Sequence, residues 1–139
     1  MWVSLAFLSA LLLGLYDVAK KRSLKENAVS RVNSICDALE GLVNAVCAVG
    51  ELSDRNKAII ISNGELLSST IICFVMNAKG IRTNFIDARK MMITSNEYLK
   101  AEPDVNEISA RVPEIVGEAF KGMDAVITQG FIGSNHSGE

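Results

Sequence analysis

The chain has 139 residues, which is enough for one ordinary domain with a hydrophobic core. A formal net charge of −2 and a charged fraction of 22% exclude the basic field that nucleic-acid binding requires. The three cysteines, Cys36, Cys47 and Cys73, have neither a CxxC pair nor a nearby histidine, so we expect buried free thiols in a reducing compartment.

The first 16 residues carry no charged side chain, and continued through Ala19 they approach the length that spans a bilayer core of about 30 Å. The cationic group at 20–22 follows this run, which argues against a signal peptide. By the positive-inside rule, the segment predicts a membrane helix with its amino end outside and the rest of the chain in the cytoplasm. The alternative is a buried or interfacial helix of a soluble protein.

Two long helices are expected next. Residues 30–49 repeat apolar side chains every three or four positions, and Gly50 follows as a stop. Ser53 or Asp54 then caps a helix over 56–79. That second helix is apolar on nearly every side, which indicates burial.

Short strands and one further helix make up the rest of the chain. The expected strands are 81–87, 91–94 and 124–128, and the expected helix is 105–120, with Pro113 as a kink or break. Helices that alternate with buried strands indicate an α/β fold with a parallel sheet. A sheet of so few strands would leave an unpaired edge, which favours self-association. The polar tail 134–139 is expected to fray.

Glu65 is the most distinctive candidate for chemistry. It is a single carboxylate between Gly64 and Leu66 in an otherwise apolar helix, where burial without a partner would be costly. Such a carboxylate can receive an ammonium group through charge-assisted hydrogen bonds. The alternative is that Glu65 faces water.

A glycine-bounded turn at the end of the last strand is the second candidate. Gly130, Phe131 and Gly133 stand where backbone N–H groups can approach an anion closely. Asp87 and Arg89, at the end of an earlier strand, form a third group, for which solvated surface charge is an equally good interpretation. His136 has no partner acid or nucleophile near it in sequence and is expected to be solvated.

Three blocks in this order resemble the catalytic domain of aspartokinases of the lysine-sensitive type: 61–69 (ISNGELLSS), 85–90 (FIDARK) and 128–133 (TQGFIG). The resemblance runs from about residue 51 to residue 139. It implies a partial three-layer α/β/α amino-acid-kinase fold, preceded here by the apolar amino-terminal helix. It also implies that L-aspartate is the ligand, with Glu65, Gly130 and Phe131 as substrate-binding residues and with Asp87 and Arg89 in supporting roles. Asn63 departs from the His or Tyr usual in the family.

The same resemblance implies an activity: transfer of the ATP γ-phosphate to L-aspartate with Mg²⁺, at the head of lysine, threonine and methionine synthesis. The family's KFGGTS and TTLGRGGSD segments, which serve phosphate binding, are absent from the sequence. No catalytic residue is therefore identified, and we expect little or no turnover from this chain alone.

Residues 1–29 are expected to form a separate unit from a partial catalytic domain at 30–139. Within them, 14–29 resemble the first helix of EamA-type drug/metabolite transporters. Two alternatives to the enzymatic interpretation follow. The chain is either a membrane-anchored interaction fragment or a non-functional fusion of two unrelated segments.

Overall fold

A computed structural model describes residues 26–139. The predicted amino-terminal helix and its transporter-like segment fall almost entirely outside this range. Within it lie four helical elements and two strands: α2 (Glu26–Val49), α3 (Asp54–Ala78), β1 (Thr83–Ile86), the short 3₁₀ helix η1 (Ala88–Lys90), α4 (Val105–Ala119) and β2 (Ala125–Thr128).

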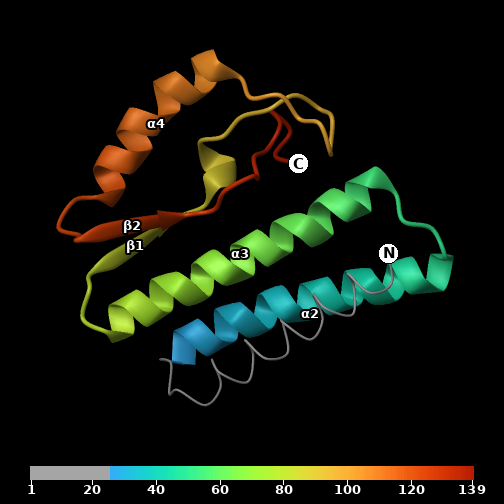
Figure 1. The fold of residues 1–139 in the computed structure, drawn as a ribbon, viewed down its shortest axis with the longest axis horizontal. Coiled ribbons are helices and arrows are strands. Elements are labelled where there is room, and N and C mark those ends of the chain that lie inside the picture. The colour runs from blue at the N-terminus through green and yellow to red at the C-terminus, as the bar shows by residue number, and fades with distance from the viewer. Residues whose placement is uncertain (1–25) are drawn as a thin grey trace.

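The two strands form a parallel sheet between two helical layers, which confirms the predicted α/β class (Figure 1). Helix α3 packs against one face of the sheet, and α2 packs against α3 on the outer side. Helix α4 lies on the opposite face, next to β1. The register pairs Thr83 with Ala125 and Ile86 with Thr128.

The ends of α3 follow the predicted signals closely. The Ser53 hydroxyl accepts a hydrogen bond from the backbone N–H of Asn56, as an N-cap residue does. Gly50 ends α2 and Gly80 follows α3, both with positive φ, a conformation that glycine adopts without steric cost.

Pro113 was expected to kink or break the last helix, and that expectation is wrong in part, because α4 runs unbroken through it. The hydrogen bond that Pro113 cannot donate would have gone to the carbonyl of Ser109. Both residues are exposed, so water can hydrate that carbonyl. Asp104 begins the helix and accepts hydrogen bonds from the N–H groups of Asn106 and Glu107.

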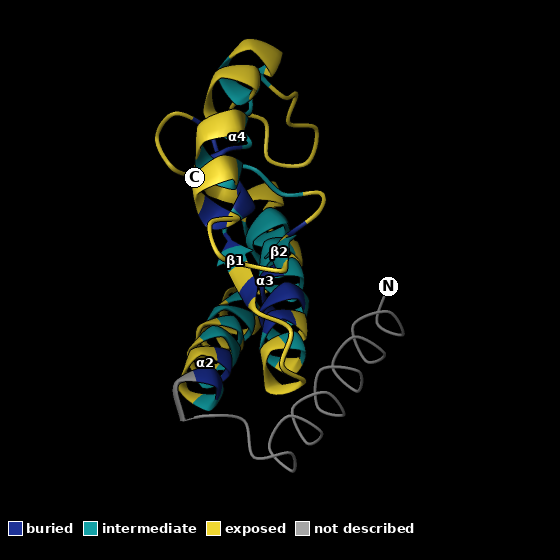
Figure 2. Ribbon diagram, turned by 90° about the vertical axis from the view of Figure 1, so that its left-hand side faces the viewer, coloured by how far each residue is buried: buried dark blue, intermediate teal, exposed yellow. Residues whose placement is uncertain are grey.

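The main hydrophobic core lies between the sheet and α4, around Ile86, Met91 and Ala119. A second buried group, which includes Leu67 and Cys73, lies on the inner side of α3. Much of α2 remains exposed, whereas most of α3 is buried or half-buried (Figure 2). The prediction of three buried thiols is wrong in part, because Cys47 is exposed and Cys36 is half-buried.

Two helices among the described residues, 28–49 and 54–78, are long and apolar enough to cross a membrane by length and composition. The core helix of a soluble protein satisfies the same test, and α3 packs against a sheet here. These helices are not the segment for which the sequence predicts a membrane span.

Candidate active site

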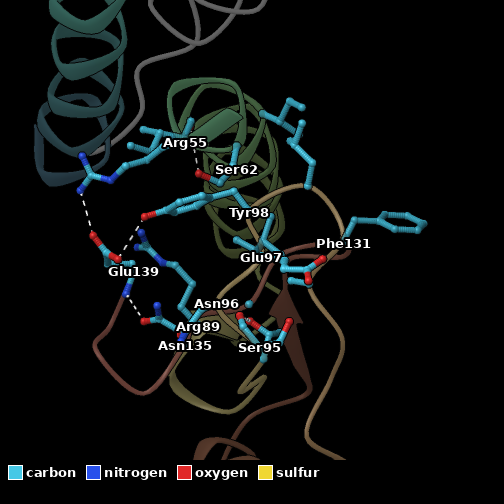
Figure 3. A pocket seen from close by; sticks show the side chains of 18 of the residues that line it. Arg55, Ser62, Arg89, Ser95, Asn96, Glu97, Tyr98, Phe131, Asn135 and Glu139 are labelled. Carbon is cyan, nitrogen blue, oxygen red and sulfur yellow. Dashed lines mark hydrogen bonds and ion pairs between the residues drawn. The ribbon is translucent and has the colours of Figure 1, made fainter. Parts of the chain in front are cut away.

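A cavity of about 490 Å³ lies between the first half of α3, the loop after η1 and the segment after β2 (Figure 3). Its wall combines apolar side chains such as Ile59 with polar and charged ones. The charged side chains in the wall are Arg55, Arg89, Glu97 and Glu139. Two cations and two carboxylates in one small cavity suit a small zwitterionic ligand.

The chain after β2 is held beside the loop that follows η1 by Ser134. Its backbone N–H donates to the carbonyl of Met92 at 2.9 Å, and its carbonyl accepts from the N–H of Thr94 at 2.9 Å. Its hydroxyl donates to the carbonyl of Arg89 at 2.7 Å. The predicted strand at 91–94 is therefore replaced by isolated bridges, one of which joins Ile93 to Ser134.

Gly133 is required at this contact because there is no room for a larger residue. A Cβ atom there would lie 2.5 Å from the carbonyl oxygen of Met92 and 2.7 Å from the Thr94 methyl group. A Cβ at Gly130 would contact nothing within 4 Å. The tight contact in this turn therefore belongs to its second glycine, and the expected approach of an anion to the backbone N–H groups stays a prediction.

Arg89 is held in place by Asp87. The carboxylate accepts hydrogen bonds from Nε at 2.9 Å and from Nη2 at 2.6 Å, and it also accepts from the backbone N–H of Arg89 at 3.1 Å. The hydrogen bond from the guanidinium holds the pKa of Asp87 below its usual range, although partial burial opposes this. The guanidinium is thus fixed in one orientation in the cavity wall.

Glu139 joins two other walls of the cavity. One carboxylate oxygen accepts from Arg55 Nη2 at 3.1 Å and the other from the hydroxyl of Tyr98 at 3.1 Å (Figure 3). These hydrogen bonds, first that of Tyr98 and then that of Arg55, lower the pKa of Glu139. The tail is not frayed as predicted, because Ser134 and Asn135 are buried.

The structure brings together some of the predicted site residues and not others. Arg89 and Phe131 line the cavity, and Asp87 supports Arg89 from outside it. Glu65 is half-buried on α3, one turn beyond the cavity-lining Ser62, and is not part of the wall. Gly130 is exposed and also lies outside the wall. The substrate-binding roles of Glu65, Gly130 and Phe131 therefore stay predictions.

Phe131 is unusual in both backbone and side chain. Its φ of 57° lies in the left-handed region that non-glycine residues rarely adopt. Its exposed fraction is 104%, so its ring packs against nothing in the described residues. In Figure 3 the ring is directed away from Arg55, Tyr98 and Glu139. Strained, unpacked residues of this kind concentrate at functional sites.

Sequence reasoning missed Arg55, Tyr98 and Glu139. Their contacts join positions 41 and 84 residues apart, and none of the three belongs to a local motif. His136 is exposed, as predicted.

The described residues contain no group of three or more His, Cys, Asp or Glu side chains placed to hold a metal ion. A Mg²⁺ site of the usual kind needs carboxylate ligands together with substrate phosphates.

Comparison with known proteins supports the sequence resemblance. No protein-family model matches the chain. An aspartokinase of Chlamydia muridarum is 32% identical over 89 residues, which are 64% of this chain and 20% of the relative. The lysine-sensitive aspartokinase 3 of Escherichia coli is 31% identical over 80 residues, 57% of this chain and 17% of the relative. The chain thus spans about a fifth of the length of these curated relatives.

Solved structures of E. coli aspartokinase III share the fold. The structure in complex with lysine and aspartate gives a TM-score of 0.82, and the one with aspartate and ADP gives 0.83. Each is 21% identical and covers 95% of this chain and 29% of the solved chain. The 5% of this chain that the structural match leaves out contains fewer residues than α2. The match therefore includes residues before position 51, where the sequence resemblance begins. These relatives do not support the transporter resemblance of 14–29.

Proposed function

We propose that this chain forms the part of an aspartokinase-type catalytic domain that binds the amino-acid substrate, and that it binds L-aspartate. The chain is similar in sequence and fold to part of the aspartokinases. The observation that carries this proposal is the cavity whose wall includes both the fixed guanidinium of Arg89 and the turn at Phe131 and Gly133. The solved relatives contain aspartate in their complexes.

The charges in the cavity match the charges of the ligand. L-Aspartate carries two carboxylates and one ammonium group, and the wall offers two guanidinium groups, those of Arg55 and Arg89, for the carboxylates. Arg89 can bind a carboxylate through the N–H groups that Asp87 does not use. Glu65 is proposed to attract the ammonium group from one turn beyond the wall, and Gly130 and Phe131 to border the ligand.

Phosphoryl transfer is proposed as the activity of a complete aspartokinase, not of these residues alone. That reaction converts ATP and L-aspartate to 4-phospho-L-aspartate at the start of lysine, threonine and methionine synthesis. It requires a cationic cradle and Mg²⁺ to neutralise the phosphates, and the family's KFGGTS and TTLGRGGSD segments, which serve phosphate binding, are not in this sequence. ATP and Mg²⁺ therefore stay implications of the aspartokinase relationship.

Calorimetric titration of the full 139-residue chain with L-aspartate tests the proposal. We expect saturable binding that is lost in Arg89→Met and weakened in Phe131→Ala. Arg82→Met is the matched control, because Arg82 pairs with Asp124 outside the cavity and should leave binding unchanged. L-Lysine serves as the ligand control. Equal heats for L-aspartate and L-lysine, or equal loss in both arginine variants, would refute the proposal.

An ADP-release assay with ATP, Mg²⁺ and L-aspartate tests the absence of turnover from the chain alone. Turnover that Glu65→Gln abolishes would show that the missing segments are dispensable.

We place the domain at 30–139 in the cytoplasm, with a tether at 1–29 as the further prediction. Resistance of the chain to carbonate extraction from membranes would support the tether, and full recovery in the soluble fraction would contradict it.

A further inference from the structure

The two oxygens of the Glu139 side chain are engaged at one end of the cavity. One accepts from Arg55 Nη2 at 3.1 Å and the other from the Tyr98 hydroxyl at 3.1 Å. A cation and a hydroxyl that share one carboxylate make up a carboxylate-binding subsite. We infer that Arg55 and Tyr98 bind a carboxylate of the ligand, and that the Glu139 side chain occupies their subsite when no ligand is present.

The donors come from two walls that are otherwise separate. Arg55 lies in the first turn of α3, and Tyr98 lies in the loop that follows η1. Figure 3 shows both side chains directed toward Glu139, with Arg89 extending toward the same side of the cavity. A ligand with two carboxylates can therefore contact Arg89 with one and the Arg55–Tyr98 subsite with the other.

The Glu139 side chain can leave this position at little cost. Arg55 and Glu139 are both exposed, and exposed ion pairs contribute little to stability. The backbone of Glu139 is held separately, because its N–H donates to Asn135 Oδ1 at 2.9 Å and its carbonyl accepts from the Asn135 N–H at 2.9 Å. The side chain can thus swing away while residues 135–139 keep their conformation.

Competition follows from this arrangement. A ligand carboxylate must displace the Glu139 carboxylate, so the intrinsic affinity of the subsite is reduced by the fraction of time that Glu139 fills it. Removing the Glu139 carboxylate should raise ligand affinity, which is unusual for a change in a cavity wall. The identity of the ligand as L-aspartate rests on the proposed function, whereas the carboxylate class rests on Arg55 and Tyr98 alone.

Calorimetric titration of the full chain with L-aspartate, and separately with succinate, tests the inference. Glu139→Ala is expected to bind both ligands about threefold to fivefold more tightly than the wild type, which is the range that an exposed ion pair supports. Glu97→Gln removes a second carboxylate from the same cavity and is the matched control, with no gain expected. Arg55→Met should weaken binding, and Glu139→Ala should bring no gain in that background.

Each outcome decides between the two proposals. A gain with succinate but no binding of L-aspartate supports the subsite and refutes the proposed function. Equal binding of L-aspartate by wild type and Glu139→Ala keeps the proposed function and overturns the inference. An equal gain in Glu97→Gln, or no binding of either ligand by either chain, overturns it as well.

Discussion

The side-chain amide of Asn77, near the end of α3, hydrogen-bonds to both backbone groups of Thr83, the first residue of β1. Its Nδ2 donates to the Thr83 carbonyl at 2.8 Å, and its Oδ1 accepts from the Thr83 N–H at 3.1 Å. Thr83 is buried, so water does not replace these bonds easily. Asn77 thus fixes the start of the sheet against the helix that supplies one wall of the cavity.

We expect Asn77→Leu to lower the free energy of unfolding by about 2 kcal/mol, because it leaves the buried N–H of Thr83 without its side-chain partner and the Thr83 carbonyl with only the weak thiol donor of Cys73. Urea unfolding followed by circular dichroism measures the change. Asn63→Ala is the control, since Asn63 donates only to the Ile59 carbonyl one turn back on its own helix. A loss at Asn77 no larger than that at Asn63 would contradict this role.

The two glycines of the turn after β2 should respond differently to alanine. Gly133→Ala forces a Cβ atom against the Met92 carbonyl, and we expect a loss of about 2 kcal/mol from overpacking. Gly130→Ala adds a methyl group into open space and should be nearly neutral. Thermal unfolding of the two variants side by side gives the comparison, and equal melting temperatures would show that the close contact is absent in solution.

The positive φ of Phe131 should lower the free energy of unfolding. Replacement by glycine relieves the positive φ and removes no packed surface, so we expect a gain of about 1 kcal/mol in the free energy of unfolding. Phe131→Ala keeps a Cβ at the same φ and should leave stability unchanged. If both variants also bind L-aspartate less tightly, the ring contributes to binding independently of the backbone. A gain from alanine equal to that from glycine would argue against backbone strain.

The Asp87–Arg89 pair should give stability a specific dependence on pH. The pKa of Asp87 is lowered in the folded chain, so the stabilisation is fully present above the unfolded pKa and is lost as the pH falls through the folded pKa. Between about pH 5 and pH 2, wild-type stability should therefore fall more steeply than that of Asp87→Asn, with a difference of about 1 kcal/mol at neutral pH. Urea unfolding at a series of pH values measures both curves, and parallel curves would rule out the pair as the cause.

Local signals predicted most of the fold. Ser53 and Gly50 lie at helix ends in the positions where short-range chemistry requires them. The failure at Pro113 has a local physical cause as well, because the carbonyl that loses its partner belongs to the exposed Ser109. The strand expected at 91–94 fails for a longer-range reason, since its partners Ser134 and Pro103 offer single bridges and no continuous ladder.

The candidate site was less predictable than the fold. Arg89 and Phe131 belong to blocks that resemble aspartokinases, and the cavity includes both. Arg55, Tyr98 and Glu139 belong to no block, and only the tertiary fold brings them together. A periodic pattern reports which face of an element is buried, but it carries no information on which distant side chain will meet it.

The position of the cavity along the sequence has a consequence for synthesis. Helices α2 and α3 are adjacent in sequence and pack on each other, so they can pair while later residues are still being added by the ribosome. The Arg55–Glu139 contact spans 84 positions and cannot form until Glu139 has left the exit tunnel. Intermediates in which Glu139 is still inside the tunnel would therefore carry a finished helical hairpin but not the contact between Arg55 and Glu139.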